Sequence, residues 1–282
     1  MSDRALIDVK LQQLQEMLAT MDEGSLTSFQ ERLDMSWIYH DCALEGVVLT
    51  YHELKSAIDR DVVSDVSLIP TYDEIRAHKN ALDWIREQAA KGKKHPITLE
   101  LLLELREVLQ PEPTVVNAVA LVSPMDLSDG GLPLETPKPK PLPVETSPYR
   151  KDTPVHRLYF HDIPAADKIA GEMIKLAEWL QEPEAKKLPA IRLAARLHFR
   201  LMQIYPFSKN SGKHARLAMN MVLLRAGYPP AIIHSTERQR YYEALRGPVA
   251  ALQGIMLESL ENSIESAIKM FTESKSGRRA MT

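Results

Sequence analysis

Residues 188–230 read LPAIRLAARLHFRLMQIYPFSKNSGKHARLAMNMVLLRAGYPP, and this stretch decides the fold. Its first part has the spacing of an amphipathic helix that ends near Tyr205, where a Pro206-Phe207 break follows. A short polar loop then leads into a second, strongly apolar helix, for which Gly227 predicts a C-terminal cap. The pattern predicts a helix, loop, helix unit.

The loop has the features of an anion site. A helix entered through Asn210, Ser211 and Gly212 points free backbone N–H groups outward. From the residues alone an alternative stays open, in which Ser211 is only an N-cap and the nearby cations form a solvated rim. The predicted anion- or nucleotide-binding residues are Lys209, Asn210, Ser211, Gly212, Lys213 and Arg216.

The amino-acid composition excludes several classes of protein and of site. The 282 residues are 44% hydrophobic with a net charge of −3, so the chain can bury a sizeable core but has no global field to attract nucleic acid or an anionic membrane. The single cysteine, Cys42, excludes an intramolecular disulfide and a thiolate zinc site. Without a signal-peptide core or a long apolar run, we expect a cytoplasmic protein with no membrane or nucleic-acid partner.

The rest of the chain predicts further helices and one proline-rich interruption. Residues 110–148 carry prolines throughout, which predicts an insertion or linker, although TVVNAVALV at 114–122 has the composition of a strand. The expected parts are an N-terminal helical region (1–109), the insertion (110–148), a core (149–250) and a C-terminal helix and tail (251–282). The predicted helices are 5–21, 29–45, one capped by Thr50 with Glu53, 71–90, one capped by Thr98, 165–181, 188–204, 212–226, 235–246 and 248–272.

The loop resembles the Fic (Fido) motif, HPFxDGNGRxxR, in the same helix, loop, helix context. The stretches MNMVLLRAGYPPAII and TERQRYYEALR after it, and ITLELLLELREVL before it, are similar to the family's surroundings. The resemblance covers roughly residues 30–110 and 149–250. It implies a mainly α, Fic-type helical bundle with a short β-hairpin flap, and a family chemistry that transfers AMP to a protein hydroxyl.

The loop departs from that motif where the family's chemistry resides. The resemblance assigns the general base to the position of Tyr205, and a phenol with a pKa of about 10 is a poor base at neutral pH. It assigns magnesium binding to the position of Lys209, which repels a divalent cation. With Ser211 in place of the motif's asparagine, these three catalytic positions are degenerate. We therefore expect no metal and no magnesium, while ATP or another phosphate-bearing ligand stays possible.

Other motif positions are partly kept. Lys213 replaces the first arginine and keeps charge without the bidentate fork. The resemblance retains Pro206, Phe207, Gly212 and Arg216. The histidines that could replace the missing base are His214, His156 and His161.

A second family element is an inhibitory helix with the pattern [ST]xxxE[GN]. Asp41-Cys42-Ala43-Leu44-Glu45-Gly46 resembles it, with Asp41 in place of Ser or Thr. The resemblance implies that Glu45 is inhibitory and pairs with Arg216. The alternative is that Glu45 is an exposed helix-end carboxylate and Gly46 a cap.

Two further regions are assigned by the resemblance. YRKDTPVHRLYF, at 149–160, lies where the family has its flap, which binds a protein partner by strand addition; a surface connection is the alternative. Tyr241 and Tyr242 lie where relatives approach the nucleobase, with packing against the core as the alternative. The predicted flap residues are Tyr149, Arg150, Thr153 and Val155.

Three functions are compatible with these residues, and a homo-oligomer with each. The first is a catalytically degenerate Fic-type protein, a pseudo-AMPylase, that binds a protein partner or phosphate-bearing ligand and regulates. The second is a divergent, metal-independent nucleotidyl or phosphoryl transferase in which Lys209 and Lys213 replace magnesium as charge stabilisers. The third is a structural or assembly module. Retention of Glu45 with Arg216 favours the first two.

The proline density of 110–148 generates a prediction. Replacing these residues with a short Gly/Ser bridge should leave the thermal midpoint within a few degrees, because such a segment contributes no packed helix. Calorimetric unfolding of the full chain and the deletion variant measures this. A large drop in the midpoint would show that 114–122 is a core strand.

Overall fold

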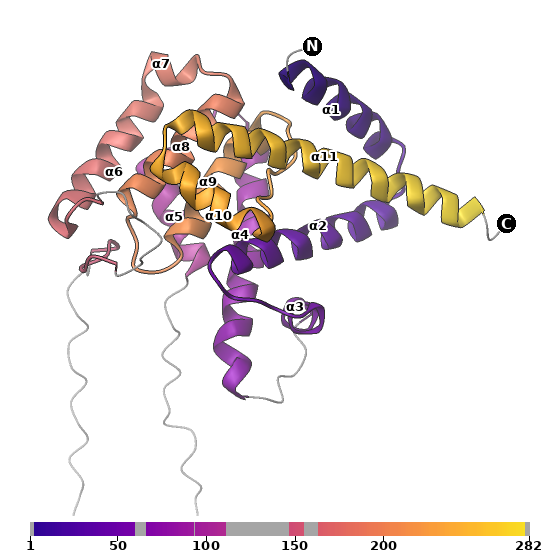
Figure 1. Cartoon of the computed structure of the whole chain (residues 1–282), viewed down its shortest axis with the longest axis horizontal. Coiled ribbons are helices and arrows are strands. Elements are labelled where there is room, and N and C mark those ends of the chain that lie inside the picture. The colour runs from indigo at the N-terminus through magenta and orange to yellow at the C-terminus, as the bar shows by residue number, and fades with distance from the viewer. Residues whose placement is uncertain (1–2, 60–65, 93, 111–146, 155–162, 280–282) are drawn as a thin grey trace, which may run out of the picture.

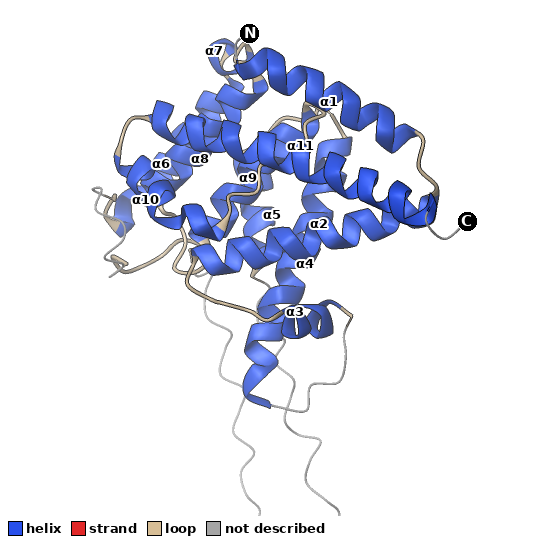
Figure 2. Ribbon diagram, turned by 45° about the vertical axis from the view of Figure 1, so that its right-hand side comes forward, coloured by secondary structure: helices blue, strands red, loops and turns tan. Residues whose placement is uncertain are grey.

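The computed structural model of the chain describes residues 3–59, 66–92, 94–110, 147–154 and 163–279. Over these ranges the protein consists of helices joined by loops and turns, with no strand (Figures 1 and 2). The predicted mainly α class is confirmed. None of the described helices is long and apolar enough to cross a bilayer.

The described helices follow one another in a bundle with short 3₁₀ turns at Val66–Leu68 and Ser235–Glu237. Their bounds are α1 (Asp3–Ala19), α2 (Glu23–Leu44), α3 (Tyr51–Ile58), α4 (Ile69–Ala90), α5 (Leu99–Leu109), α6 (Ala166–Gln181), α7 (Pro183–Lys186), α8 (Ala190–Ile204), α9 (Ser211–Arg225), α10 (Arg238–Arg246) and α11 (Val249–Arg279).

Helix α9 forms the centre of the bundle. Every residue from Ser211 to Leu223 is buried, and the helix packs against α8, α4 and α5. A helix that is enclosed on all sides exposes none of its polar side chains to water, so each of them needs a partner inside the protein. The polar residues of α9 and their partners therefore form a network inside the bundle.

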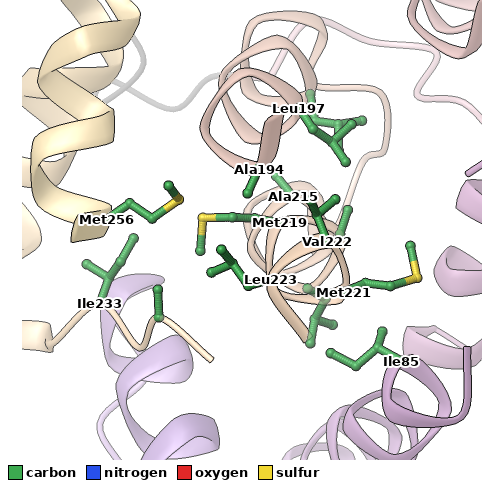
Figure 3. Close-up of a cluster of buried hydrophobic side chains, with 14 of the residues drawn as sticks. Ile85, Ala194, Leu197, Ala215, Met219, Met221, Val222, Leu223, Ile233 and Met256 are labelled. Atoms are coloured by element: carbon green, nitrogen blue, oxygen red, sulfur yellow. The ribbon is translucent and has the colours of Figure 1, made fainter. Parts of the chain in front are cut away.

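Small alanine and flexible methionine side chains pack α9 against its neighbouring helices. Ala194 of α8 and Ala215 of α9 are fully buried and lie close together in Figure 3, which lets the two helices approach closely. Met219 points toward Met256 of α11, where flexible thioether side chains fill the remaining space. The outer helices α1 and α11 run side by side over this core (Figures 1 and 2).

The predicted helix caps are largely confirmed. Thr50 and Glu53 form a reciprocal capping box at the start of α3, and the Thr98 side chain accepts a hydrogen bond from the N–H of Leu101 at the start of α5. Gly227 follows α9 with a φ of +83°, a left-handed backbone that glycine adopts without strain.

Some predicted boundaries were wrong. Helix α2 begins at Glu23, capped by Asp22, rather than near residue 29. Helix α4 begins at Ile69, with Pro70 in its first turn, so Thr71 lies inside the helix and is not a cap. Helix α11 continues to Arg279, past the predicted end at residue 272.

Two predicted β segments are not seen as strands. The described residues 147–154 form bends and irregular loop, so the first half of the expected flap hairpin is not a strand here. The rest of that segment, including Val155, lies outside the described residues. The same holds for 111–146 and thus for the expected strand at 114–122.

Candidate functional site

The loop between α8 and α9 has a left-handed backbone at both ends. Tyr205 ends α8 with φ 47° and ψ 64°, and Asn210 precedes α9 with φ 58° and ψ 15°. They are the two non-glycine residues with positive φ in the described part of the chain. Asparagine tolerates this conformation better than tyrosine, so the strain is concentrated at Tyr205, the position that the motif assigns to a base.

Ser211 braces the loop from inside. Its hydroxyl accepts a hydrogen bond from the N–H of Phe207 at 2.9 Å and donates one to the carbonyl of Phe207 at 2.8 Å. The side chain is buried, and the residue that precedes α9 as its N-cap is Asn210. The interpretation of Ser211 as the helix cap is therefore corrected, and its contact with a ligand stays a prediction.

A segment far away in sequence holds the same loop. Arg150 donates from Nε to the carbonyl of Tyr205 at 2.8 Å, and its backbone N–H donates to the carbonyl of Pro206 at 2.9 Å. The ring of Tyr149 is stacked on that of Phe207, with centroids 6.2 Å apart. Tyr149 and Arg150 were predicted as flap residues; Arg150 is buried and braces the loop, and contact of either residue with a partner stays a prediction.

In the part of the chain that the structure describes, no contact assigns a role to the other two predicted flap residues, Thr153 and Val155. Thr153 is exposed on the bend that follows, and Val155 lies outside the described residues. The structure therefore ties the beginning of the expected flap to the loop and leaves its strand character a prediction.

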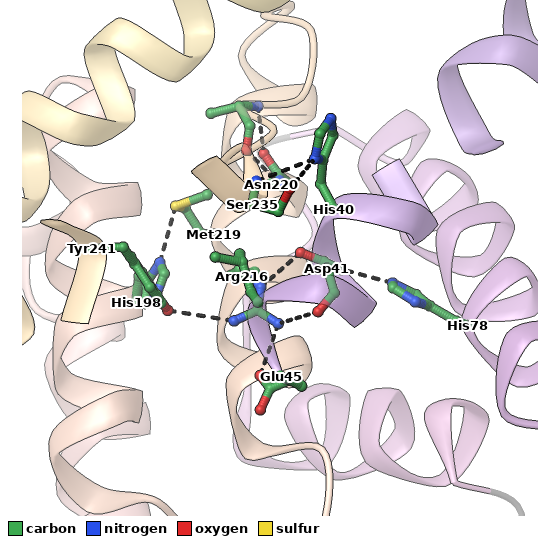
Figure 4. A network of polar contacts seen from close by, with 12 residues as sticks. His40, Asp41, Glu45, His78, His198, Arg216, Met219, Asn220, Ser235 and Tyr241 are labelled. Atoms are coloured by element: carbon green, nitrogen blue, oxygen red, sulfur yellow. Dashed lines mark hydrogen bonds and ion pairs between the residues drawn. The ribbon is translucent and has the colours of Figure 1, made fainter. Parts of the chain in front are cut away.

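Arg216 is the centre of a buried polar network (Figure 4). Its Nε donates to Oδ1 of Asp41 at 2.7 Å, and its Nη2 donates to Oε1 of Glu45 at 2.9 Å. Its Nη1 lies 3.5 Å from the hydroxyl of Tyr241. His78 of α4 places Nε2 3.2 Å from the second oxygen of Asp41. The predicted pair between Glu45 and Arg216 is present, and Asp41 adds a second one.

Asp41 and Arg216, at the centre of the network, are charged, whereas His198, at its edge, is neutral. Burial by itself would raise the pKa of Asp41, but Arg216 and His78 outweigh it and hold that pKa at about 2. Burial opposes the charge of Arg216, yet Asp41 and the other neighbours leave its pKa well above the ordinary value. Burial, together with the charge of Arg216, lowers the pKa of His198 to about 3.

Glu45 lies over the beginning of α9. A Cβ atom on Gly212 would lie 2.2 Å from Oε1 of Glu45 and 3.1 Å from Nη1 of Arg216, so only glycine fits here while the carboxylate is in place. No side chain caps α9 in the described structure. The Glu45 carboxylate therefore occupies the positive end of this helix, where an anion is most stable.

Glu45 and Asp41 differ in how firmly they are held. The side chain of Asp41 is 2% exposed, whereas that of Glu45 is 21% exposed. Glu45 is also the last residue before Gly46, whose φ of +90° ends α2. Glu45 is thus both a helix-end carboxylate and a partner of Arg216, and its inhibitory role stays a prediction.

Lys209 and Lys213, which were predicted to cluster around one anion site, have different environments in the structure. Lys209 is exposed on the loop, whereas Lys213 is 3% exposed and is close enough to Cys42 and His78 to influence the pKa of both. No hydrogen bond or ion pair to Lys213 is formed by the residues that the structure describes. The ammonium of Lys213 is therefore a donor available to an anion.

Of the three histidines predicted as possible replacement bases, the structure describes His214. Its Nε2 lies 2.8 Å from the carbonyl of Leu102 on α5, and burial lowers its pKa to about 4. It packs edge-on against Phe207. His156 and His161 lie outside the described residues. Within the described ranges no group of three or more histidine, cysteine, aspartate or glutamate residues lies close enough together to hold a metal.

Tyr241 and Tyr242 point into the core. The hydroxyl of Tyr241 lies 2.8 Å from Nε2 of His198, and that of Tyr242 donates to the carbonyl of Leu44 at 3.0 Å. Both rings are buried. Their observed contacts fit the packing alternative, and contact with a nucleobase stays an untested prediction.

Sequence reasoning missed three residues of the network. Asp41 was taken only as a departure from a motif, although its spacing of four residues from Glu45 puts both on one helix face and could have revealed it. His78 and His198 reach the network from α4 and α8, and no local signal in the sequence indicates either contact.

The chain is similar in sequence to a known protein family and to several curated proteins. Residues 136–223 match the model of the Fic/DOC family. The protein adenylyltransferase Fic of Drosophila virilis is 26% identical over 257 residues, which cover 83% of this chain and 46% of the relative. That of Drosophila melanogaster is 26% identical over 225 residues, covering 79% and 39%. The chain spans less than half the length of these curated relatives.

Solved structures show the same fold. Fic-1 of C. elegans (residues 134–508) aligns over 96% of this chain and 73% of its own with a TM-score of 0.68 and 19% identity. A Fic domain containing signaling protein from Bacteroides thetaiotaomicron aligns over 95% and 98% with a TM-score of 0.69 and 22% identity.

The buried histidines generate a prediction about pH. Because the pKa values of His198 and His214 in the folded chain, about 3 and about 4, lie below the ordinary 6.5, the unfolded chain binds more protons below pH 6.5. Stability is full above pH 6.5 and falls as pH drops toward 4. Each histidine should contribute about 1.4 kcal/mol per pH unit to this slope.

Urea unfolding at a series of pH values between 7.5 and about 4.5 measures this. His198→Gln should lower the slope by about one proton equivalent. The control is His52→Gln, which changes an exposed histidine on α3. A slope that His198→Gln leaves unchanged would contradict the prediction.

Proposed function

Because the chain carries a Fic (Fido) domain, we propose that it is a catalytically degenerate member of this fold that binds a phosphate-bearing ligand at the beginning of α9 and regulates rather than transfers AMP. One observation carries the proposal: the carboxylate of Glu45 lies at the uncapped beginning of α9, against Gly212 and paired with Arg216. A place that holds a carboxylate in this way is built for an anion.

The ligand would replace Glu45 and not Asp41. Arg216 stays anchored through Nε by the fully buried Asp41 and keeps its Nη groups for the ligand. Lys213, a largely buried residue in the first turn of α9, adds a positive charge. Glu45 is partly exposed at the end of α2, so its side chain can leave without opening the core.

The chemistry of AMP transfer has lost its usual groups. Tyr205 stands where a base is required, and Lys209 stands where an acid would bind magnesium. We do not favour the alternative of a metal-independent transferase, because the exposed ammonium of Lys209 is screened by water and stabilises developing charge weakly.

Regulation would act through the segment that follows Tyr149. Arg150 fixes this segment to the carbonyl groups of the loop, so a ligand that shifts the loop also shifts the segment. We propose that a protein partner binds there. The buried, unpaired Cys42 is compatible with the reducing cytoplasmic setting that we also propose.

The loss of catalytic groups predicts that the purified chain does not label itself. Incubation with magnesium and ATP labelled on the α-phosphate should give no incorporation, for the natural chain and for Glu45→Gly alike. Restoring activity should require Tyr205→His, Lys209→Asp and Ser211→Asn together, since each loss blocks a separate requirement. Strong labelling of the unchanged chain would contradict catalytic degeneracy.

The position of Glu45 predicts how it controls anion binding. Glu45→Gly should tighten the binding of inorganic tripolyphosphate, measured by calorimetry, by about tenfold or more, because it removes both the occupant and its negative charge. Glu45→Gln keeps the size and removes only the charge, so it should give a smaller gain. Unchanged affinity in both variants would leave Glu45 as a helix-end carboxylate only.

The control must keep the buried network balanced. Arg216→Ala alone would leave Asp41 as an unpaired buried charge and cost about 3–5 kcal/mol of stability. The combination Arg216→Met with Asp41→Asn removes both charges together. In the Glu45→Gly background it should abolish the gain in tripolyphosphate affinity, and a gain that persists would show that Arg216 takes no part.

A further inference from the structure

A cavity lies at the end of α9 opposite to the loop. Its volume is about 350 Å³, which is within the range of small-molecule sites. It is bounded by the last turn of α9 and the beginning of α8, with the ends of α6 and α7 and the entry to α5 closing the sides. Its apolar walls come from Ile97, Leu180, Leu188, Leu193 and Val222.

One cation in this cavity is left incompletely bonded. Arg225 lines the cavity and donates from Nη1 to the carbonyl of His95 at 2.8 Å. Its Nε and Nη2 atoms are buried and have no hydrogen-bond partner. These two atoms form the edge of the guanidinium with two parallel N–H groups, the edge that a carboxylate binds in a bidentate manner.

Arg225 differs in this respect from Arg216 and Arg150, the two buried arginine residues among those that the structure describes. Arg216 is paired with Asp41 and Glu45, and Arg150 gives its donors to backbone carbonyls. Arg225 forms no ion pair among the described residues, and burial without any compensating charge lowers its pKa. Two buried donor atoms that are left without an acceptor are costly.

We propose that this cavity binds a small organic monocarboxylate, whose carboxylate takes the Nε and Nη2 edge of Arg225 and whose apolar body lies against Ile97, Leu193 and Val222. The residue Arg225 is only partly buried, so its guanidinium can turn this edge into the cavity that it already lines. Lys186, which is exposed at the rim, adds a second positive charge.

The cavity is separate from the candidate phosphate site. The two lie at opposite ends of α9, whose 15 residues span about 20 Å. The inference therefore does not depend on the proposed function, and either can fail alone.

Three probes separate charge from apolar contact: octanoate, octanol with the same body and no charge, and acetate with the charge and almost no body. Calorimetric titration of the full chain should show octanoate binding at least about tenfold more tightly than either of the others, since a bond to a charged group adds this much. Absence of octanoate binding, or equal binding of octanoate and octanol, would overturn the proposal.

Variants then locate the site. Arg225→Gln should abolish the preference for octanoate over octanol, while Arg192→Gln, an exposed arginine on the first turn of α8 that does not line the cavity, should keep it. Leu193→Phe, which fills part of the cavity, should weaken octanoate and octanol together. A preference that survives Arg225→Gln would place the binding elsewhere and refute the assignment.

Folding is checked separately from binding. Since Arg225 has unsatisfied donors, Arg225→Leu should unfold at a temperature equal to or above that of the natural chain when no ligand is present. Octanoate should raise the unfolding temperature of the natural chain and not that of Arg225→Leu. A variant that is markedly less stable without ligand would show that Arg225 is structural, against the proposal.

Discussion

The burial of Arg216 inside α9 is the constraint on which the polar structure of this protein depends. Since α9 is enclosed along its length, the guanidinium cannot reach water, and its donors must be satisfied by neighbouring helices. Asp41 and Glu45 come from α2, and Tyr241, braced by His198 of α8, comes from α10. One charge thereby fixes the mutual position of four helices.

The two carboxylates on α2 share the partner but not the role. Asp41 is sealed in the core and supported by His78, so it acts as the permanent counter-ion of Arg216. Glu45 is one helical turn further along, at the C-cap of α2, where the backbone turns at Gly46. A permanent counter-ion lets the second carboxylate leave without stranding a buried charge, and this is the physical basis for treating Glu45 as the movable one.

Hydrogen bonds hold the loop between α8 and α9, although several of its residues differ from the Fic motif. Tyr205 is held in a left-handed conformation, and its carbonyl accepts a hydrogen bond from Arg150. Ser211 closes the turn on both backbone groups of Phe207. A strained turn persists only where its surroundings fix it, and these contacts fix the loop that begins at Tyr205.

Local patterns in the chain were sufficient for the helical class, the helix, loop, helix unit around residues 205–211, the caps at Thr50, Thr98 and Gly227, and the pair between Glu45 and Arg216, the last through a motif resemblance. These features depend on residues close in sequence or on a recognisable spacing. The start of α4 was misplaced because Pro70 in the first turn of the helix outweighed Thr71 as a boundary.

Tertiary contacts decided the rest. That Arg150 braces the loop, that Lys213 is buried while Lys209 is exposed, and that Asp41, His78 and His198 meet around Arg216 follow from the packing of helices far apart in sequence. No periodicity or propensity encodes such contacts, because a helix face indicates that a residue is buried but not which distant residue it will meet.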